Sequence, residues 1–176
     1  MNIRLPIQIV LASKSPRRVD LLTQLLDHQF GEGVVTFAID PPNIDETALT
    51  GETPIAHVQR LAVAKSHAVA QRYNNAAVII AADTTVDLDG KIFGQPADEQ
   101  DARTMLNELS GRTHQVHTAV AVVHLAHDGT MLSQAHGLDS AGVSMLEITP
   151  EKMEWYLATG ESLGKAGSYA VQGDGG

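Results

Sequence analysis

The chain has 176 residues, of which 43% are hydrophobic and 19% are charged, a composition typical of one globular domain rather than a disordered chain. The absence of cysteine excludes a disulfide framework and a thiolate metal site. The formal net charge of −9, from 12 Lys+Arg and 21 Asp+Glu, disfavours broad binding to nucleic acid. Since no stretch resembles a secretion signal or a membrane span, we expect a cytoplasmic protein without a membrane partner.

The first strand and the first helix are expected near the N-terminus. Residues 7–12 form an apolar run typical of a buried strand. Ser15 and Pro16 then predict an N-cap and a first helical position. Apolar residues recur at helical spacing and predict one buried helix face: Val19, Leu22, Leu25 and Leu26. Residues 34–39 predict a second strand, and the polar residues 40–52 predict a loop.

The rest of the chain alternates between strand and helix signals. Thr53 and Pro54 repeat the cap-and-proline signal and predict a long helix. The further expected elements are, in order, a strand over 77–88, a hairpin turn at 89–90, a helix capped by Asp98, a strand over 113–125, a turn over 127–130, a strand over 131–145 and a helix from Thr149–Pro150. This order predicts an α/β domain with a mixed sheet.

The segment from Ser13 to Arg18 lies between the first strand and the first helix. A helix N-terminus presents unpaired N–H groups and partial positive charge, which favour phosphate. Arg17 and Arg18 are unfavourable for that dipole unless an anion lies between them and the N–H groups, and guanidinium groups bind phosphate oxygens well. The segment therefore predicts a phosphate site; the alternative is two solvated arginines beside a routine cap.

Three carboxylates follow strands in the same way. Asp45 and Glu46 come after the second predicted strand, and Asp83 ends the apolar run of the third. In open α/β sheets the ligand crevice lies outside the carboxyl ends of the strands. Mg²⁺ prefers one or two carboxylates with water and substrate phosphate. Loop acids are often only solvated, whereas a carboxylate after five apolar residues needs a reason.

Other polar residues are ambiguous from their pattern alone. Lys65 falls on the apolar stripe of the second predicted helix, where it either snorkels to solvent or points into the ligand crevice, and Arg60 carries the same ambiguity. Gln172 lies among C-terminal glycines and could read a base edge. His114 and His117 are three apart in a predicted strand and so face opposite sides, which favours structural roles over a metal site.

Six segments in order carry a resemblance to a known family over nearly the whole chain from about residue 8. They are Leu11-Ala12-Ser13-Lys14-Ser15-Pro16-Arg17-Arg18, Asp45-Glu46, Arg60-Leu61-Ala62 with Lys65, Ala82-Asp83-Thr84, Leu109-Ser110-Gly111-Arg112-Thr113-His114, and Lys165-Ala166-Gly167-Ser168-Tyr169 with Gln172-Gly173. Together they resemble the Maf family of nucleoside triphosphate pyrophosphatases.

The resemblance implies metal-dependent hydrolysis of the α–β phosphoanhydride of a nucleoside triphosphate, with Mg²⁺, Mn²⁺ or Co²⁺ as the cation. It implies an elongated mixed α/β sheet with flanking helices and a central cleft, as in inosine triphosphate pyrophosphatases, and a homodimer. Residues 1–176 would form a single Maf-like domain without the C-terminal strand and helix that family members usually have.

The resemblance also implies roles for residues at matching positions. The Asp83 carboxylate would accept a proton from the attacking water, Glu46 and Asp83 would bind the cation, and Arg18, Thr84 and Gln172 would influence substrate choice. The complete candidate set is Glu46, Lys65 and Asp83 for catalysis, with Ser13, Arg17, Arg18, Thr84, Gln95 and Gln172 for substrate binding. Gln95 stands where the family commonly has lysine, which removes one cation from the phosphate site.

The Asp-Thr pair and the terminal Gln-Gly resemble the branch of the family that acts on dTTP and UTP. Two alternatives stay open at this point. One is specificity of the 7-methyl-GTP type. The other is a nucleotide-binding regulator of cell division with little turnover.

Overall fold

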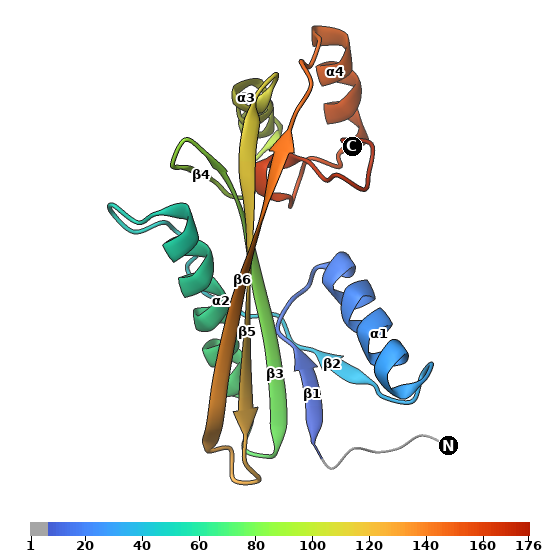
Figure 1. The fold of residues 1–176 in the computed structure, drawn as a ribbon, viewed down its shortest axis with the longest axis vertical. Coiled ribbons are helices and arrows are strands. Elements are labelled where there is room, and N and C mark those ends of the chain that lie inside the picture. Colours follow the sequence, from blue (N-terminus) through green and yellow to red (C-terminus); the bar gives the residue numbers. More distant parts are fainter. Residues whose placement is uncertain (1–6) are drawn as a thin grey trace. The chain divides into compact units, whose positions relative to one another are not determined.

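The computed structural model describes residues 7–176, and within them six strands form one sheet together with four α-helices (Figure 1). The strands are β1 (Gln8–Leu11), β2 (Phe37–Ile39), β3 (Ala77–Leu88), β4 (Lys91–Phe93), β5 (Thr113–Leu125) and β6 (Met131–Ser144). The helices are α1 (Pro16–Phe30), α2 (Pro54–Ala70), α3 (Glu99–Leu109) and α4 (Pro150–Thr159), with a short 3₁₀ turn at Ala166–Ser168. The strand order is β2-β1-β3-β5-β6, with β4 on β3. The predicted mixed α/β fold is confirmed.

The chain divides into two compact units. The first unit takes residues up to Thr47, then Gln59–Asp83 and Ala119–Leu138. The second unit takes Ala48–Val58, Thr84–Thr118 and Asp139–Gly176. Across residues 7–176, no helix is both long enough and apolar enough to cross a membrane.

In the first unit, β1 pairs in parallel with both β2 and β3. Helix α1 begins as predicted, with Ser15 as N-cap and Pro16 in its first turn. Leu22 and Leu26 are buried and pack with Leu11 in an apolar cluster. The prediction was wrong for Leu25, which is 56% exposed, because the buried stripe of α1 is narrow and this residue lies at its margin.

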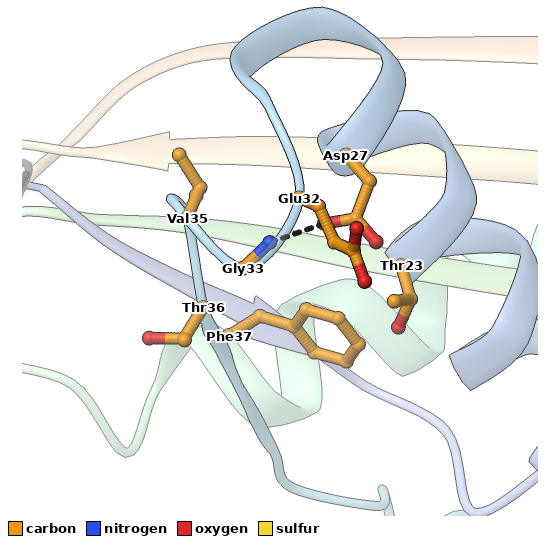
Figure 2. A pocket seen from close by; sticks show the side chains of 7 residues that line it. All are labelled: Thr23, Asp27, Glu32, Gly33, Val35, Thr36 and Phe37. Atoms are coloured by element: carbon orange, nitrogen blue, oxygen red, sulfur yellow. Dashed lines mark hydrogen bonds between the residues drawn. The ribbon is translucent and has the colours of Figure 1, made fainter. Parts of the chain in front are cut away.

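Strand β2 is shorter than the predicted 34–39 and begins only at Phe37. The preceding residues stay in a turn, because the Gly33 N–H donates to Asp27 Oδ1 at 2.9 Å and the Val34 N–H donates to the Gly31 carbonyl at 3.1 Å. Figure 2 shows this turn at the edge of a pocket of about 430 Å³. The pocket is lined by Thr23, Asp27, Glu32, Gly33, Val35, Thr36 and Phe37, none of them a predicted site residue.

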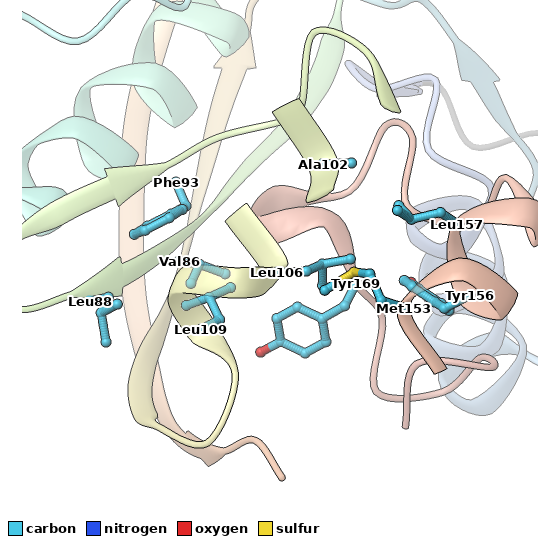
Figure 3. Packing of buried hydrophobic residues seen from close by; sticks show 10 residues of the cluster. All are labelled: Val86, Leu88, Phe93, Ala102, Leu106, Leu109, Met153, Tyr156, Leu157 and Tyr169. Carbon is cyan, nitrogen blue, oxygen red and sulfur yellow. The ribbon is translucent and has the colours of Figure 1, made fainter. Parts of the chain in front are cut away.

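The second unit is built on the end of β3 and the antiparallel strand β4, with Val86 opposite Phe93. The turn between these strands is the predicted one, and both of its residues have positive φ, 54° at Asp89 and 85° at Gly90. Figure 3 shows the ten buried side chains of this unit's core, which come from β3, β4, α3, α4 and Tyr169. A Cβ on Gly167 would lie 2.8 Å from Val86 Cγ2, so the backbone there needs glycine.

Two histidines of β5 are buried in the second unit, as their spacing on opposite sides of a strand allows. His114 Nε2 lies 2.6 Å from the Tyr169 hydroxyl, and His117 Nδ1 lies 2.7 Å from Ser140 Oγ. Burial lowers the pKa of His114 and raises the pKa of Tyr169 to about 12. Both shifts favour the neutral forms, so this contact is a neutral hydrogen bond inside the core.

We expect the lowered pKa of His114 to make the protein acid-sensitive. The unfolded chain, with an ordinary histidine pKa of about 6.5, takes up this proton before the folded chain does as pH falls. Stability is therefore lost below about pH 6.5 as pH falls toward the folded-state pKa. Urea denaturation at pH 7, 6 and 5 should show a smaller loss for His114→Gln than for the wild type. The exposed His127→Gln should keep the wild-type slope; equal slopes in all three proteins would refute this assignment.

Candidate functional site

The candidate site lies in the first unit, just beyond the stretch over which the parallel strands β1 and β3 are paired. The register sets Leu11 of β1 opposite Ile80 of β3, and the Ala12 N–H donates to the Ile80 carbonyl at 2.7 Å. Ser13 follows this paired stretch on one strand and Asp83 follows it on the other. Ser13 and Asp83 are 70 residues apart in the sequence, and the parallel pairing of β1 and β3 brings both to the same region of the sheet. The prediction that Asp83 follows its strand was wrong, because β3 continues past it to Leu88.

Lys65 joins the two predicted catalytic carboxylates. Its Nζ lies 2.7 Å from Asp83 Oδ1 and 2.7 Å from Glu46 Oε2. The side chains of Lys65 and Asp83 are both 8% exposed, whereas that of Glu46 is 50% exposed. The ambiguity over Lys65 is thus resolved: its ammonium is buried between two acids rather than extended into solvent. A buried charge of this kind needs its partners, because an unpaired one is strongly destabilising.

Ser13 and Arg18 form the second part of the site. Ser13 is buried, and its Oγ accepts hydrogen bonds from the Ser15 N–H at 3.2 Å and from Arg18 Nη1 at 3.4 Å. Burial lowers the pKa of Arg18, while the negative charges of Asp83 and Glu46 raise it; the guanidinium stays protonated in either case. Arg17 is exposed. The two arginines therefore differ, and Arg18 is the one held in the field of the carboxylates.

Arg60 holds the loop that carries Glu46. Its Nη2 donates to the Thr47 carbonyl at 3.1 Å, and the Thr47 N–H donates to Asp45 Oδ1 at 2.9 Å. Hydrogen bonds from Thr47 lower the pKa of Asp45. Asp45 thus stabilises the loop, and Arg60 anchors it to α2. The sequence pattern left Arg60 undecided, because helical spacing does not report a contact with a loop carbonyl thirteen residues earlier.

The other three predicted substrate-binding residues belong to the second unit. Thr84 Oγ1 lies 3.1 Å from Thr118 Oγ1, so neighbouring strands hold its hydroxyl. Gln95 is exposed and follows Gly94, whose carbonyl accepts a hydrogen bond from the Gly167 N–H at 3.0 Å. Gln172 is exposed near the end of the chain.

The two carboxylates at Lys65 have oxygen donors of the kind that suit a hard divalent cation. Glu46 and Asp83 each use one oxygen on Lys65, and each carboxylate has a second oxygen. Oxygen ligands of this kind suit Mg²⁺ or Mn²⁺, which usually keep water and phosphate oxygens as further ligands. Within residues 7–176, no three or more His, Cys, Asp or Glu side chains form a group that could hold a metal ion.

The chain matches a known protein family and is similar in sequence to several named proteins. The model of the family described as Maf-like protein matches residues 8–176. A relative from Symbiobacterium thermophilum named "dTTP/UTP pyrophosphatase" is 39% identical over 94% of this chain and 78% of its own length. Relatives with the same name from Myxococcus xanthus and Shewanella denitrificans are each 43% identical, over 96% and 95% of this chain and 78% and 81% of their own lengths.

A solved structure, a nucleoside-triphosphatase / dITP/XTP pyrophosphatase from Mycobacterium abscessus, aligns with 78% of this chain and 74% of its own at a TM-score of 0.49. Its sequence identity is only 17%, so it says nothing about the substrate of this chain. The sequence matches cover 94–96% of the chain, and the family model spans the residues of the Lys65 site. The chain belongs to the Maf-like protein family.

Proposed function

We propose that this protein is a nucleoside triphosphate pyrophosphatase that hydrolyses dTTP and UTP to the monophosphate and pyrophosphate. The observation that best supports this function is the buried Lys65 ammonium, which contacts Glu46 and Asp83 in the same unit as Arg18. In this proposal the cluster supplies cations for phosphate and a carboxylate for water, just beyond the paired stretch of β1 and β3. The substrate assignment rests on the relatives named dTTP/UTP pyrophosphatase.

In the proposed reaction, a water oxygen bonds to one of the two phosphorus atoms that flank the α–β bridging oxygen. The bond from that phosphorus to the bridging oxygen breaks, and the water proton passes to the Asp83 carboxylate. Water is a poor nucleophile at neutral pH, so a positioned base contributes substantially to the rate. The contact between Lys65 Nζ and Asp83 Oδ1 fixes the orientation of the carboxylate. The second oxygen, Oδ2, is not part of this contact.

Positive groups are expected to offset the charge that spreads over the phosphoryl oxygens in the transition state. Lys65 is the buried candidate, Arg18 is half-buried, and Arg17 is exposed at the start of α1. The first N–H groups of α1 and the Ser13 hydroxyl complete the proposed phosphate site. Side chains that are held before the substrate arrives do not need to be ordered during the reaction, which is the advantage of preorganised charge.

A divalent cation (Mg²⁺, Mn²⁺ or Co²⁺) is part of the proposal, with Glu46 and Asp83 as its protein ligands. When bound, such an ion withdraws charge from phosphate oxygens and orients the polyphosphate chain.

Selection of the base is assigned to Thr84 and Gln172, together with Arg18, and Gln95 contributes a neutral amide to the substrate site. We also propose that the enzyme works in the cytoplasm as a homodimer, and that its charge of −9 keeps it from nucleic acid.

A panel of triphosphates tests this proposal directly. Pyrophosphate release, measured by a coupled phosphate assay, should be fastest with dTTP and UTP and slower by about tenfold or more with purine triphosphates, a difference within reach of pocket contacts to the base. Chelation of divalent cations with EDTA should stop the reaction, and added Mg²⁺ should restore it. Preference for 7-methyl-GTP would overturn the substrate assignment. Tight binding of every nucleotide without turnover would support a regulator instead of an enzyme.

A further inference from the structure

Lys65 already provides a cation to both carboxylates that are proposed to bind the metal. Its Nζ lies at 2.7 Å from an oxygen of each, and its side chain is almost completely buried. A divalent ion that approaches the same pair would meet a fixed positive charge beside it. In a partly buried site such repulsion is weakly screened by water, so it acts strongly on ion affinity.

The charges of the cluster balance without any metal. Glu46 and Asp83 carry two negative charges, and Lys65 and Arg18 carry two positive ones. Both carboxylates act electrostatically on Arg18, so all four groups belong to one local field. The described residues 7–176 also contain no group of three or more His, Cys, Asp or Glu side chains suited to a metal. The nucleotide-free cluster therefore lacks the net negative charge that favours tight binding of a divalent ion.

We infer that Lys65 makes divalent-cation binding dependent on the nucleotide: the free protein holds the ion weakly, and the ion is bound tightly only with the triphosphate. This inference rests on the proposed function, since the triphosphate is what supplies the missing negative charge and oxygen ligands. The phosphates also give Lys65 and Arg18 new partners, which frees carboxylate charge for the ion. Lys65 thereby acts as a positioning residue that stands in for the ion until the substrate arrives.

Binding of Mn²⁺ to the purified full chain, followed by the electron paramagnetic resonance signal of the free ion at pH 8, tests this inference without catalysis. Without nucleotide, Lys65→Met is expected to bind Mn²⁺ at least about tenfold more tightly than the wild type, because one positive charge next to both carboxylates is gone. Lys91→Met is the matched control, since Lys91 is an exposed lysine paired with Glu108 in the second unit. It should leave the Mn²⁺ affinity unchanged.

The same titration with the α,β-imido analogue of dTTP completes the experiment. In the wild type the analogue should tighten Mn²⁺ binding by at least about tenfold, as expected for added phosphate ligands, and Lys65→Met should show a smaller gain. Equal Mn²⁺ affinity of the wild type and Lys65→Met without nucleotide would overturn the inference. Lys65→Gln, checked with Lys65→Met by circular dichroism, provides a second variant if one of them fails to fold. A tighter Mn²⁺ site in a protein that releases no pyrophosphate would leave this inference intact and reject only the proposed function.

Discussion

Asp83→Asn is expected to lower kcat for pyrophosphate release by about 10²- to 10⁴-fold, the range that a general base usually contributes. The amide has nearly the same shape as the carboxylate and can still meet Lys65, but it cannot accept the proton of the attacking water. Glu46 would remain as a charged partner for Lys65, so the folded structure should persist. Initial rates with saturating dTTP and Mg²⁺ measure the effect.

Asp128→Asn is the matched control for this variant. Asp128 is an exposed aspartate of the first unit, and its carboxylate accepts a hydrogen bond from the Thr130 N–H in the turn between β5 and β6. The same chemical change there should leave kcat within about twofold of the wild type, because surface substitutions away from special features have small effects. If Asp83→Asn kept a tenth or more of the wild-type rate, Asp83 could not be the base.

Arg18→Met is expected to lower kcat/KM for dTTP by about 10- to 100-fold, which corresponds to the loss of a hydrogen bond to a charged group. The guanidinium lies in the field of Asp83 and Glu46 and approaches Ser13, so it is held where a phosphate of the substrate is proposed to bind. Arg18→Lys keeps the charge but loses the planar fork, and it should fall between the wild type and Arg18→Met. Steady-state kinetics over a range of dTTP concentrations separate kcat from KM.

Arg17→Met provides the comparison for Arg18. Arg17 lies beside Arg18 in the first turn of α1 but is exposed, and an exposed cation in water contributes little. We therefore expect a loss of about threefold or less in kcat/KM from this variant. A larger loss from Arg17→Met than from Arg18→Met would show that Arg17, and not Arg18, makes the phosphate contact.

Local signals in the sequence predicted most of the fold. Ser15–Pro16, Asp98 and Thr149–Pro150 mark the starts of helices α1, α3 and α4 as expected, because caps and prolines act through the backbone of a few neighbouring residues. Strand β3 has its predicted bounds. A long apolar run followed by a turn signal leaves few alternatives for where the strand begins and ends. Strand β2 was misjudged because the apolar residues before Phe37 are held in a turn by contacts to Asp27 and Gly31.

The candidate site was predictable only in part. The rule for parallel strands predicted that Ser13 and Asp83 lie in the same region of the sheet, but it did not predict that Asp83 lies within β3 and not at its end. The contact of Lys65 with both acids did not follow, because helical spacing says which face a residue occupies and not which loop lies across from it. Arg60 is the same case: its hydrogen bond to the Thr47 carbonyl depends on the path of an irregular loop.

The products formed from dTTP show which phosphoanhydride bond the protein cleaves. After incubation of the wild-type protein with dTTP and Mg²⁺, separation of nucleotides by ion-exchange chromatography and ³¹P NMR of the phosphates should show dTMP and pyrophosphate in equal amounts. Asp83→Asn under the same conditions should leave dTTP intact. Formation of dTDP with inorganic phosphate would rule out the proposed reaction, because the bond cleaved would then be the β–γ and not the α–β phosphoanhydride.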